Sequence, residues 1–226
     1  MNPLQYKAVL FDFDGTLYDK SKMGVMLVLH NPSRALWLKA NQHTRSVMKG
    51  KECNDRTHFY EVYFEALQHS IGKKSITLEQ ARRWYFSSFL PLMIRVLRLH
   101  YKAYPGITEM VESIHKAGGR ACIFSDYPCI DERLGALGIE CDFDLKISAE
   151  DAGALKPATR PFLEIAKQLN LAPSEILMIG DRLDTDGEGA LNVGMAFIRI
   201  VKKHKKDRAT PYDMTWRELM NAFRER

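Results

Sequence analysis

The run Tyr6-Lys-Ala-Val-Leu-Phe-Asp12-Phe-Asp14-Gly15 begins with consecutive β-prone residues and stops at a glycine. This pattern predicts a short buried strand. Two carboxylates, those of Asp12 and Asp14, stand at its C-terminal end. Both aspartates would then lie at the edge of a sheet, where a strand gives way to a loop.

Downstream of Pro105, apolar runs of strand length alternate with helical patterns and short turns. We expect strands at residues 120–125, 143–147, 176–179 and 196–200, with helices at 107–116, up to 137, at 161–169, from about 184 and from 215. Such alternation is typical of parallel β-α-β units with helices on both faces of the sheet. The sequence therefore predicts an α/β fold, a Rossmann-like three-layer core around a parallel sheet.

The segment between residues 20 and 104 differs from the rest in the spacing of its apolar residues, which is helical and shows no clear strand. Residues 57–71 carry apolar side chains at helical spacing, and Thr77 with Gln80 forms a capping-box pattern that opens another helix. Pro91 should break or kink that helix, with a further helix following through His100. We expect an all-helical unit at residues 20–104, inserted into an α/β core made of residues 1–19 and 105–226.

Composition excludes several classes of protein. The chain has 226 residues, of which 46% are hydrophobic and 27% charged, as in ordinary globular proteins. Its longest apolar run is Gly24 to Leu29, far short of the roughly 20 residues of a transmembrane helix. The N-terminus has no apolar signal core, and the four cysteines form no C-x-x-C pair. We expect a soluble, cytoplasmic protein with reduced thiols and no membrane partner.

The net charge of +5 conceals an asymmetry. Residues 21–104 hold 14 Lys or Arg and 5 Asp or Glu, a balance of +9, whereas the remainder has a balance of −4. The acidic part could hold a cation, and the basic part could attract an anionic substrate. Alternatively, basic residues such as Arg95, Arg98 and Lys102 simply form solvated helix faces. The basic stretch 202–208 is short and lacks interleaved aromatics, so no nucleic-acid partner is expected.

Polar residues follow the predicted strands at their carboxyl ends, where parallel sheets bind ligands. They are Asp12, Asp14, Ser125, Lys156, Asp181 and Asp186. Two carboxylates about 4 Å apart repel by roughly 4 kcal/mol, so several together require a cation or a shared proton. A site built only from oxygen ligands suits Mg²⁺. Lysine and serine donors fit phosphoryl oxygens, and an aspartate nucleophile completes phosphoryl transfer through an aspartyl-phosphate.

These residues resemble the four motifs of the haloacid dehalogenase superfamily, and most closely its phosphoglycolate phosphatase-like branch. The matching stretches are Asp12-Phe-Asp14-Gly-Thr16, Ser125, Lys156-Pro157 and Gly180-Asp181-Arg-Leu-Asp-Thr-Asp186. The resemblance covers about 140 residues, those of the predicted core. The first motif is quite specific, and the fourth is moderately so.

The resemblance implies roles in phosphoryl transfer. Asp12 would be the nucleophile. Asp14 would protonate the leaving oxygen and then activate water. Ser125 would hold a phosphoryl oxygen, and Lys156 would neutralise the phosphoryl group. Asp126 stands where asparagine is frequent; we count it with the phosphate-binding residues, although an acid there could weaken anion binding or point away.

The resemblance also implies a Mg²⁺ site. Asp12, the backbone carbonyl of Asp14 and Asp181 would bind the ion. Asp186 would bind it through water or orient the lysine, while Asp184 fits a helix-capping role better. Gly187 replaces the bulky aliphatic residue that is usual in the fourth motif, so the helix after this motif could start differently.

We therefore expect a Mg²⁺-dependent phosphatase that acts on a small phosphorylated metabolite, as a monomer or homodimer. Its helical unit would be a cap domain that closes over the site and reads the leaving group. The alternatives are a phosphomutase of the β-phosphoglucomutase type and a non-catalytic, polyanion-binding regulatory protein on the same fold. Dehalogenation is disfavoured because halide needs no general acid such as Asp14, and phosphonate cleavage because no lysine has an apolar pocket signature.

Overall fold

A parallel sheet forms the centre of the computed structural model, which describes residues 2–72, 76–204 and 210–224. Within these residues the sheet has six strands in the order β3-β2-β1-β4-β5-β6, and every neighbouring pair is parallel. The strands are β1 (Ala8–Phe11), β2 (Arg120–Ser125), β3 (Leu145–Ser148), β4 (Ile176–Gly180), β5 (Ala196–Val201) and β6 (Asp213–Thr215). The predicted α/β fold with a parallel sheet is confirmed.

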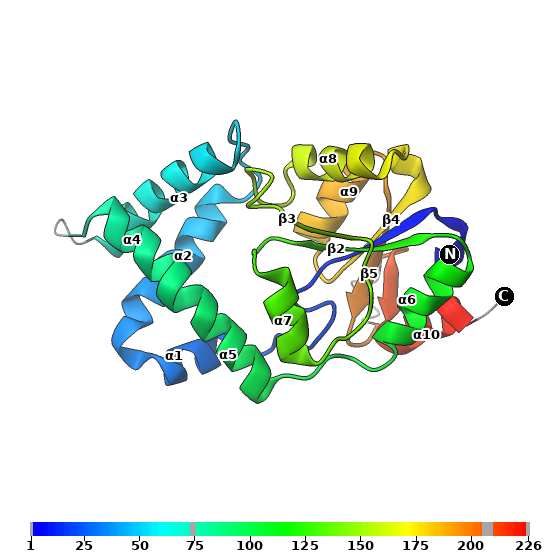
Figure 1. Ribbon diagram of the computed structural model, residues 1–226, viewed down its shortest axis with the longest axis horizontal. Coiled ribbons are helices and arrows are strands. Elements are labelled where there is room, and N and C mark those ends of the chain that lie inside the picture. The colour runs from blue at the N-terminus through cyan, green and yellow to red at the C-terminus, as the bar shows by residue number, and fades with distance from the viewer. Residues whose placement is uncertain (1, 73–75, 205–209, 225–226) are drawn as a thin grey trace.

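Helices cover both faces of this sheet (Figure 1). One face packs against α6 (Ile107–Lys116), α7 (Ile130–Leu137) and α10 (Trp216–Arg224), and the other against α8 (Thr159–Leu169) and α9 (Glu188–Asn192). Successive residues of β1 alternate between the two layers: Val9 and Phe11 join the first cluster, and Ala8 and Leu10 the second. Because both faces are buried, the strand is apolar throughout, as its sequence indicated.

The two edge strands differ most from the sequence prediction. β3 begins at Leu145, two residues later than predicted, because its register is set by pairing with Cys122 of β2. β6 was not predicted at all. Its three residues, Asp-Met-Thr, are all partly exposed and carry no apolar alternation, and they form a strand through pairing with β5.

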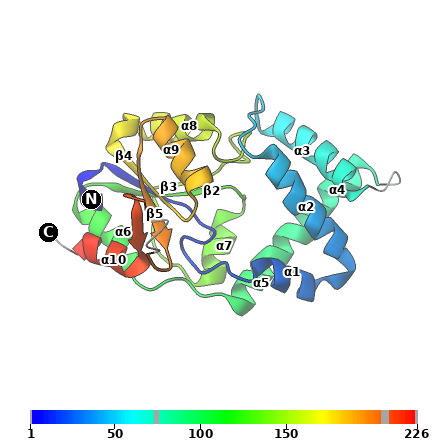
Figure 2. The same cartoon turned by 180° about the vertical axis from the view of Figure 1, so that it is seen from behind.

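Residues 20–104, called the helical segment below, form a separate layer beside the sheet (Figure 2). Their main helices are α1 (Met23–His30), α2 (Ala35–Met48), α3 (Arg56–Ile71), α4 (Leu78–Trp84) and α5 (Leu90–His100). The described part of this segment contains no strand, as predicted, and most of its buried apolar residues form a cluster of their own. The capping box of Thr77 and Gln80 is present. Pro91 lies in the first turn of α5, after a π-helical turn at Tyr85–Phe89, so the helical path continues instead of breaking.

Among the described residues, backbone hydrogen bonds and bridges join the helical segment to the α/β core at two places. At its ends, Tyr104 N donates to Leu17 O over 2.8 Å, and Tyr18 forms a bridge with Ala103. At the far side, Cys53 N donates to Gly153 O over 2.9 Å beside a bridge between Glu52 and Ala154. The core residue Leu155 packs into the hydrophobic cluster of the helical segment. These contacts join the two layers at opposite sides of the space between them.

The surface of the molecule agrees with the sequence at the positions that the structure describes. Across the described residues, no helix combines the length and the apolar character needed to cross a membrane. Arg95, Arg98 and Lys102 are exposed, in agreement with solvated helix faces. Of the basic stretch 202–208, residues 205–208 lie outside the described residues.

Candidate active site

A cavity of about 640 Å³ lies between the carboxyl edge of the sheet and the helical segment. The α/β core contributes the predicted residues Asp12, Asp14, Asp126, Lys156, Asp181 and Asp186 to its wall. The helical segment contributes polar and charged residues of α2 together with apolar residues of α1 and α5. The cavity therefore brings six of the seven predicted site residues together, and the exception is Ser125.

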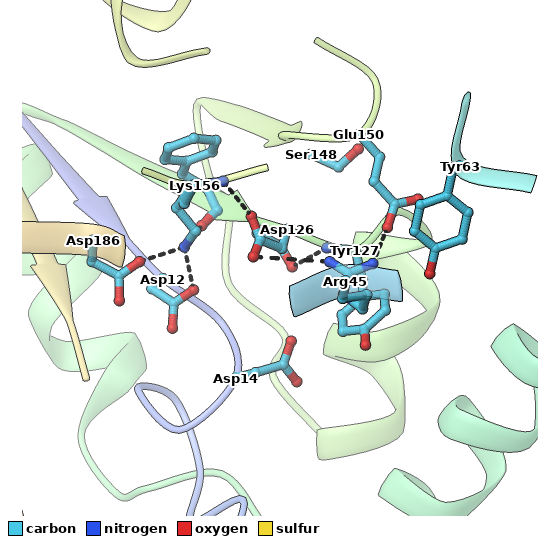
Figure 3. Close-up of polar contacts among 12 residues, drawn as sticks. Asp12, Asp14, Arg45, Tyr63, Asp126, Tyr127, Ser148, Glu150, Lys156 and Asp186 are labelled. Atoms are coloured by element: carbon cyan, nitrogen blue, oxygen red, sulfur yellow. Dashed lines mark hydrogen bonds and ion pairs between the residues drawn. The ribbon is translucent and has the colours of Figure 1, made fainter. Parts of the chain in front are cut away.

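Asp12 and Lys156 form the centre of the site (Figure 3). Asp12 follows β1, and its backbone N–H extends the sheet by donating to Ile179 O over 2.8 Å. The buried carboxylate accepts from Thr16 Oγ1 at 2.9 Å and from Lys156 Nζ at 2.6 Å. The same ammonium lies 2.5 Å from Asp186 Oδ1. A buried lysine is thus held between two carboxylates, one directly after β1 and one in the helical turn after β4, which fixes the position of all three groups.

Three carboxylates crowd this edge of the sheet. Oxygens of Asp12, Asp181 and Asp186 all lie within 4.8 Å of one another. Burial and the nearby charge of Asp12 raise the pKa of Asp186 to about 7 and also raise that of Asp181. A Cβ at Gly180 would lie 2.5 Å from the Asp186 side chain, so a glycine is needed for this close approach. Burial is the largest cause of both rises and the charge of Asp12 adds to it, so a cation at this edge would favour the ionised carboxylates.

A cation does stand among the nearby oxygens in this structure, namely the ammonium of Lys20. Its Nζ donates to the backbone carbonyl of Asp14 over 2.8 Å and lies 2.7 Å from Asp181 Oδ2. Gly15 makes the approach possible: its φ is +92°, and a Cβ there would collide with Asp181 and with Lys20. The oxygens of Asp14 and Asp181 thus face a position that favours positive charge, so the donor set fits a divalent cation.

The carboxylate of Asp14 turns away from Asp12. It accepts from Tyr18 OH at 2.6 Å and from Arg133 Nη2 at 2.5 Å. Burial alone would raise its pKa, but Arg133, Tyr18 and Lys20 together lower it below the ordinary value. Arg133 is fully buried, and its guanidinium lies 3.9 Å from the ring centroid of Phe13. Asp14 is therefore held in its ionised form in this arrangement.

Ser125 is the last residue of β2, Asp126 follows it, and their side chains contact different partners. The Ser125 hydroxyl is fully buried and accepts from Arg133 Nη1 at 2.8 Å. Asp126 lies in the cavity wall, where its Oδ1 accepts from the backbone N–H of Lys156 at 3.0 Å. Its Oδ2 lies 3.8 Å from Arg45 Nη2 of α2. Asp126 thus faces the helical segment and the lysine backbone.

Asp184 lies outside the carboxylate cluster. It is exposed and pairs with Arg182 at 2.6 Å and with Lys49, the residue after α2. These two cations lower its pKa, with the Arg182 hydrogen bond as the largest cause. The helix after the fourth motif starts with a π-helical turn at Leu183–Gly187, where a Cβ on Gly187 would lie 2.7 Å from Phe197.

Sequence reasoning missed Arg45, Arg133 and Lys20. The first two carry a signal that could have revealed them. Arg133 lies on the buried stripe of α7 with Ile130, Leu134 and Leu137, and Arg45 continues the buried stripe of Leu38, Asn41 and Met48 on α2. An arginine on an otherwise buried helix face requires a carboxylate partner. Lys20 shows no comparable signal, because it sits in a polar loop.

The family model of haloacid dehalogenase-like hydrolases matches residues 6–194, which include all four motifs. The chain belongs to this family of hydrolases. The resemblance seen in the sequence is confirmed.

Two curated relatives of these hydrolases span nearly the whole chain. The glyceraldehyde 3-phosphate phosphatase of Methanopyrus kandleri is 28% identical, with 89% of this chain and 86% of the relative covered. The phosphoglycolate phosphatase of Nitrosospira multiformis is 26% identical over 85% and 82% of the two chains. The expectation that this haloacid dehalogenase-like hydrolase is a phosphoric monoester hydrolase, a phosphatase, is thereby confirmed.

Solved structures of the family share the fold. The magnesium-bound structure of YfnB from Bacillus subtilis, described as a HAD hydrolase, aligns with a TM-score of 0.66 at 18% identity over 98% of this chain and 100% of that chain. The L-2-haloacid dehalogenase of Xanthobacter autotrophicus aligns with a TM-score of 0.59 at 22% identity, over 89% and 80%. At these identities the comparison shows a common architecture and does not distinguish dehalogenases from phosphatases.

Proposed function

We propose that this phosphatase hydrolyses a small phosphorylated metabolite through an aspartyl-phosphate on Asp12, with Mg²⁺ bound at the carboxylate cluster. The observation that carries the proposal is the placement of Asp12. Its carboxylate is buried at the end of a central strand, opens into the cavity, and has an ammonium at 2.6 Å to balance incoming phosphoryl charge. These features suit a nucleophile for a phosphate ester.

In the first step, an oxygen of Asp12 attacks phosphorus, and the bond from phosphorus to the leaving oxygen breaks. Lys156 stays within reach of Asp12 and stabilises the negative charge of the transferring group. Asp14 supplies the proton to the leaving oxygen. Because Arg133 and Tyr18 hold Asp14 ionised, its carboxyl must move off Arg133 and take up a proton before it acts as an acid.

In the second step, water attacks phosphorus, the bond from phosphorus to the Asp12 oxygen breaks, and inorganic phosphate leaves with the Asp12 carboxylate restored. Asp14 accepts the proton of the attacking water as a general base. The contact with Arg133 favours this ionised state, so the two halves of the reaction require different environments for one carboxyl group.

Mg²⁺ fits the oxygens of Asp12, Asp14 and Asp181, with Asp186 next to them. When bound, the ion would neutralise carboxylate and phosphoryl charge so that two anions can meet. Asp186 has its own function in keeping Lys156 directed at Asp12, since its Oδ1 holds the ammonium at 2.5 Å. The magnesium reported for YfnB supports the choice of ion.

We also infer that the helical segment, residues 20–104, is a cap domain. It provides the wall of the cavity opposite Asp12, so it would exclude water and contact the leaving group. The relatives act on two- and three-carbon phosphate esters, which makes glyceraldehyde 3-phosphate and phosphoglycolate the first substrates to examine.

The test is release of inorganic phosphate from a panel of metabolite phosphates, with Mg²⁺ and with excess chelator. We expect turnover of at least one member that chelator abolishes and Mg²⁺ restores. Turnover of a sugar phosphate only with a bisphosphate activator would instead identify a phosphomutase. Folded protein without release from any member, but with salt-sensitive polyanion binding, would favour the regulatory alternative.

Lys20→Met is expected to increase the affinity for Mg²⁺ by about tenfold or more, because the ammonium occupies oxygens that the ion needs and repels it. Isothermal titration calorimetry with MgCl₂ in the absence of substrate measures this directly. Lys22→Met is the matched control: it removes the same charge from an exposed residue of the same loop and should leave the affinity unchanged. Weaker Mg²⁺ binding in Lys20→Met would mean that the lysine supports the ligands instead of competing.

A further inference from the structure

Arg45 belongs to the helical segment, and its side chain lies in the wall of the cavity, where it contacts residues of the core. Its Nη1 lies 2.5 Å from Glu150 Oε1, in the loop after β3, and its Nη2 faces Asp126 Oδ2 at 3.8 Å. The guanidinium stacks on the ring of Tyr127, with 3.6 Å to the centroid. Figure 3 shows this arrangement, in which one cation of α2 contacts three residues from two loops of the core. Such a set of contacts fixes the guanidinium in one place.

Asp126 connects this arginine to the phosphoryl site. Its other oxygen, Oδ1, accepts from the backbone N–H of Lys156, whose ammonium contacts both Asp12 and Asp186. A continuous line of polar contacts therefore runs from Arg45 through Asp126 to the lysine beside the nucleophile (Figure 3). The line crosses from the helical segment into the core.

Charge explains why Asp126 needs a partner. A carboxylate at the edge of a site that must accept a phosphate dianion disfavours binding, because the two negative charges repel. Arg45 supplies the compensating positive charge, and among the described residues its Nη2 is buried without a hydrogen-bond partner of its own. The second carboxylate, Glu150, is fully buried and also accepts from Tyr60 and Tyr85, so it anchors the other side of the guanidinium.

We propose that Arg45 is a positioning residue, which neutralises Asp126 and so completes the phosphate-binding site only when the helical segment is docked on the core. This role rests on the proposed phosphatase mechanism. Arg45 acts through Asp126 and Lys156 and does not contact the leaving group. Its removal therefore weakens the binding of every phosphate by the same factor, whatever the phosphate is attached to.

The decisive readout is inhibition by inorganic phosphate, which has no leaving group. We expect Arg45→Met to raise the inhibition constant of phosphate, and the KM of phosphoglycolate and of p-nitrophenyl phosphate, by about tenfold each. The double variant Arg45→Met/Asp126→Asn should recover most of this loss, because it removes the uncompensated charge. Arg95→Met, which removes a positive charge from an exposed position of α5, is the control for general charge steering and should change none of these constants.

If Arg45 only holds the helical segment on the core, Asp126→Asn will not rescue Arg45→Met. If Arg45 contacts the leaving group, the losses will differ between the two esters. Either result overturns the proposal.

Asp126→Asn alone tests the proposal if Arg45→Met does not fold. Its amide oxygen can still accept from Lys156, and loss of the charge should leave phosphate binding equal or tighter. Tenfold weaker binding in this variant would also overturn the proposal. Failure of the phosphatase mechanism is separate, since it would appear as absence of turnover in the wild type.

Discussion

Asp12→Asn is expected to reduce phosphate release by on the order of 10⁴-fold or more, with the fold retained. A carboxamide is a poor nucleophile, so no aspartyl-phosphate forms. The amide oxygen can still accept from Thr16, which lies 2.9 Å from the present carboxylate. Lys156 loses one carboxylate partner but keeps Asp186, and one of three crowded carboxylates is removed, so the thermal midpoint should stay the same or rise. Phosphate release at saturating substrate and a thermal melt followed by circular dichroism measure the two effects.

Asp19→Asn is the matched control for this variant. Asp19 follows β1 as Asp12 does, and its substitution by asparagine also removes one negative charge. It is paired with Lys202 on the surface, however, and lies outside the wall of the cavity. Its turnover should remain within about twofold of the wild type, as is usual for surface changes. Substantial turnover by Asp12→Asn under conditions that exclude deamidation would remove Asp12 from the role of nucleophile.

The convergence of Asp12, Lys156, Asp181 and Asp186 could be predicted from the sequence because parallel strands end at one edge of the sheet. Each of these residues sits directly after an apolar strand or just before a helix, so its approximate place depends only on local signals. The direction in which each side chain points could not be predicted in this way, because it depends on contacts with residues distant in the sequence. Whether Asp126 would face the phosphate or point away was left open by the sequence, because its direction depends on the backbone of Lys156 and on Arg45, which lies 81 positions earlier in the chain.

Contacts between the helical segment and the core could not be predicted for the same reason. Glu150 follows β3 in a loop whose sequence, Ser-Ala-Glu-Asp-Ala-Gly, gives no hint of a buried carboxylate. It is fully buried because α2, α3 and the π-helical turn each direct a polar group at it. Only the packing of two distant segments brings these partners together, and no pattern of period 2 or 3.6 records it.

Glu150→Ala is expected to lower the free energy of unfolding by about 3–5 kcal/mol, the usual cost of removing one partner from a buried ion pair. The change leaves the guanidinium of Arg45 without its nearest carboxylate and deprives the hydroxyls of Tyr60 and Tyr85 of their acceptor. Each buried hydroxyl left unpaired adds to the loss. Urea unfolding followed by circular dichroism measures the difference.

Two variants separate the buried contacts from the loss of a charge in this loop. Asp151→Ala removes the neighbouring carboxylate, which is exposed, pairs with Arg56 and accepts from Ser148 Oγ at 2.6 Å, and should cost about 1–2 kcal/mol. Glu150→Gln keeps an acceptor for both tyrosines and for Arg45. Because burial already raises the pKa of Glu150, loss of its charge should cost less than half as much as loss of the side chain.

Equal losses of stability in Glu150→Ala and Asp151→Ala would mean that the buried carboxylate does not hold the helical segment to the core. A loss confined to Glu150→Ala, together with faster proteolysis between residues 20 and 104, would place the main attachment of this segment at Glu150, on the side opposite the chain connections at residues 18 and 103.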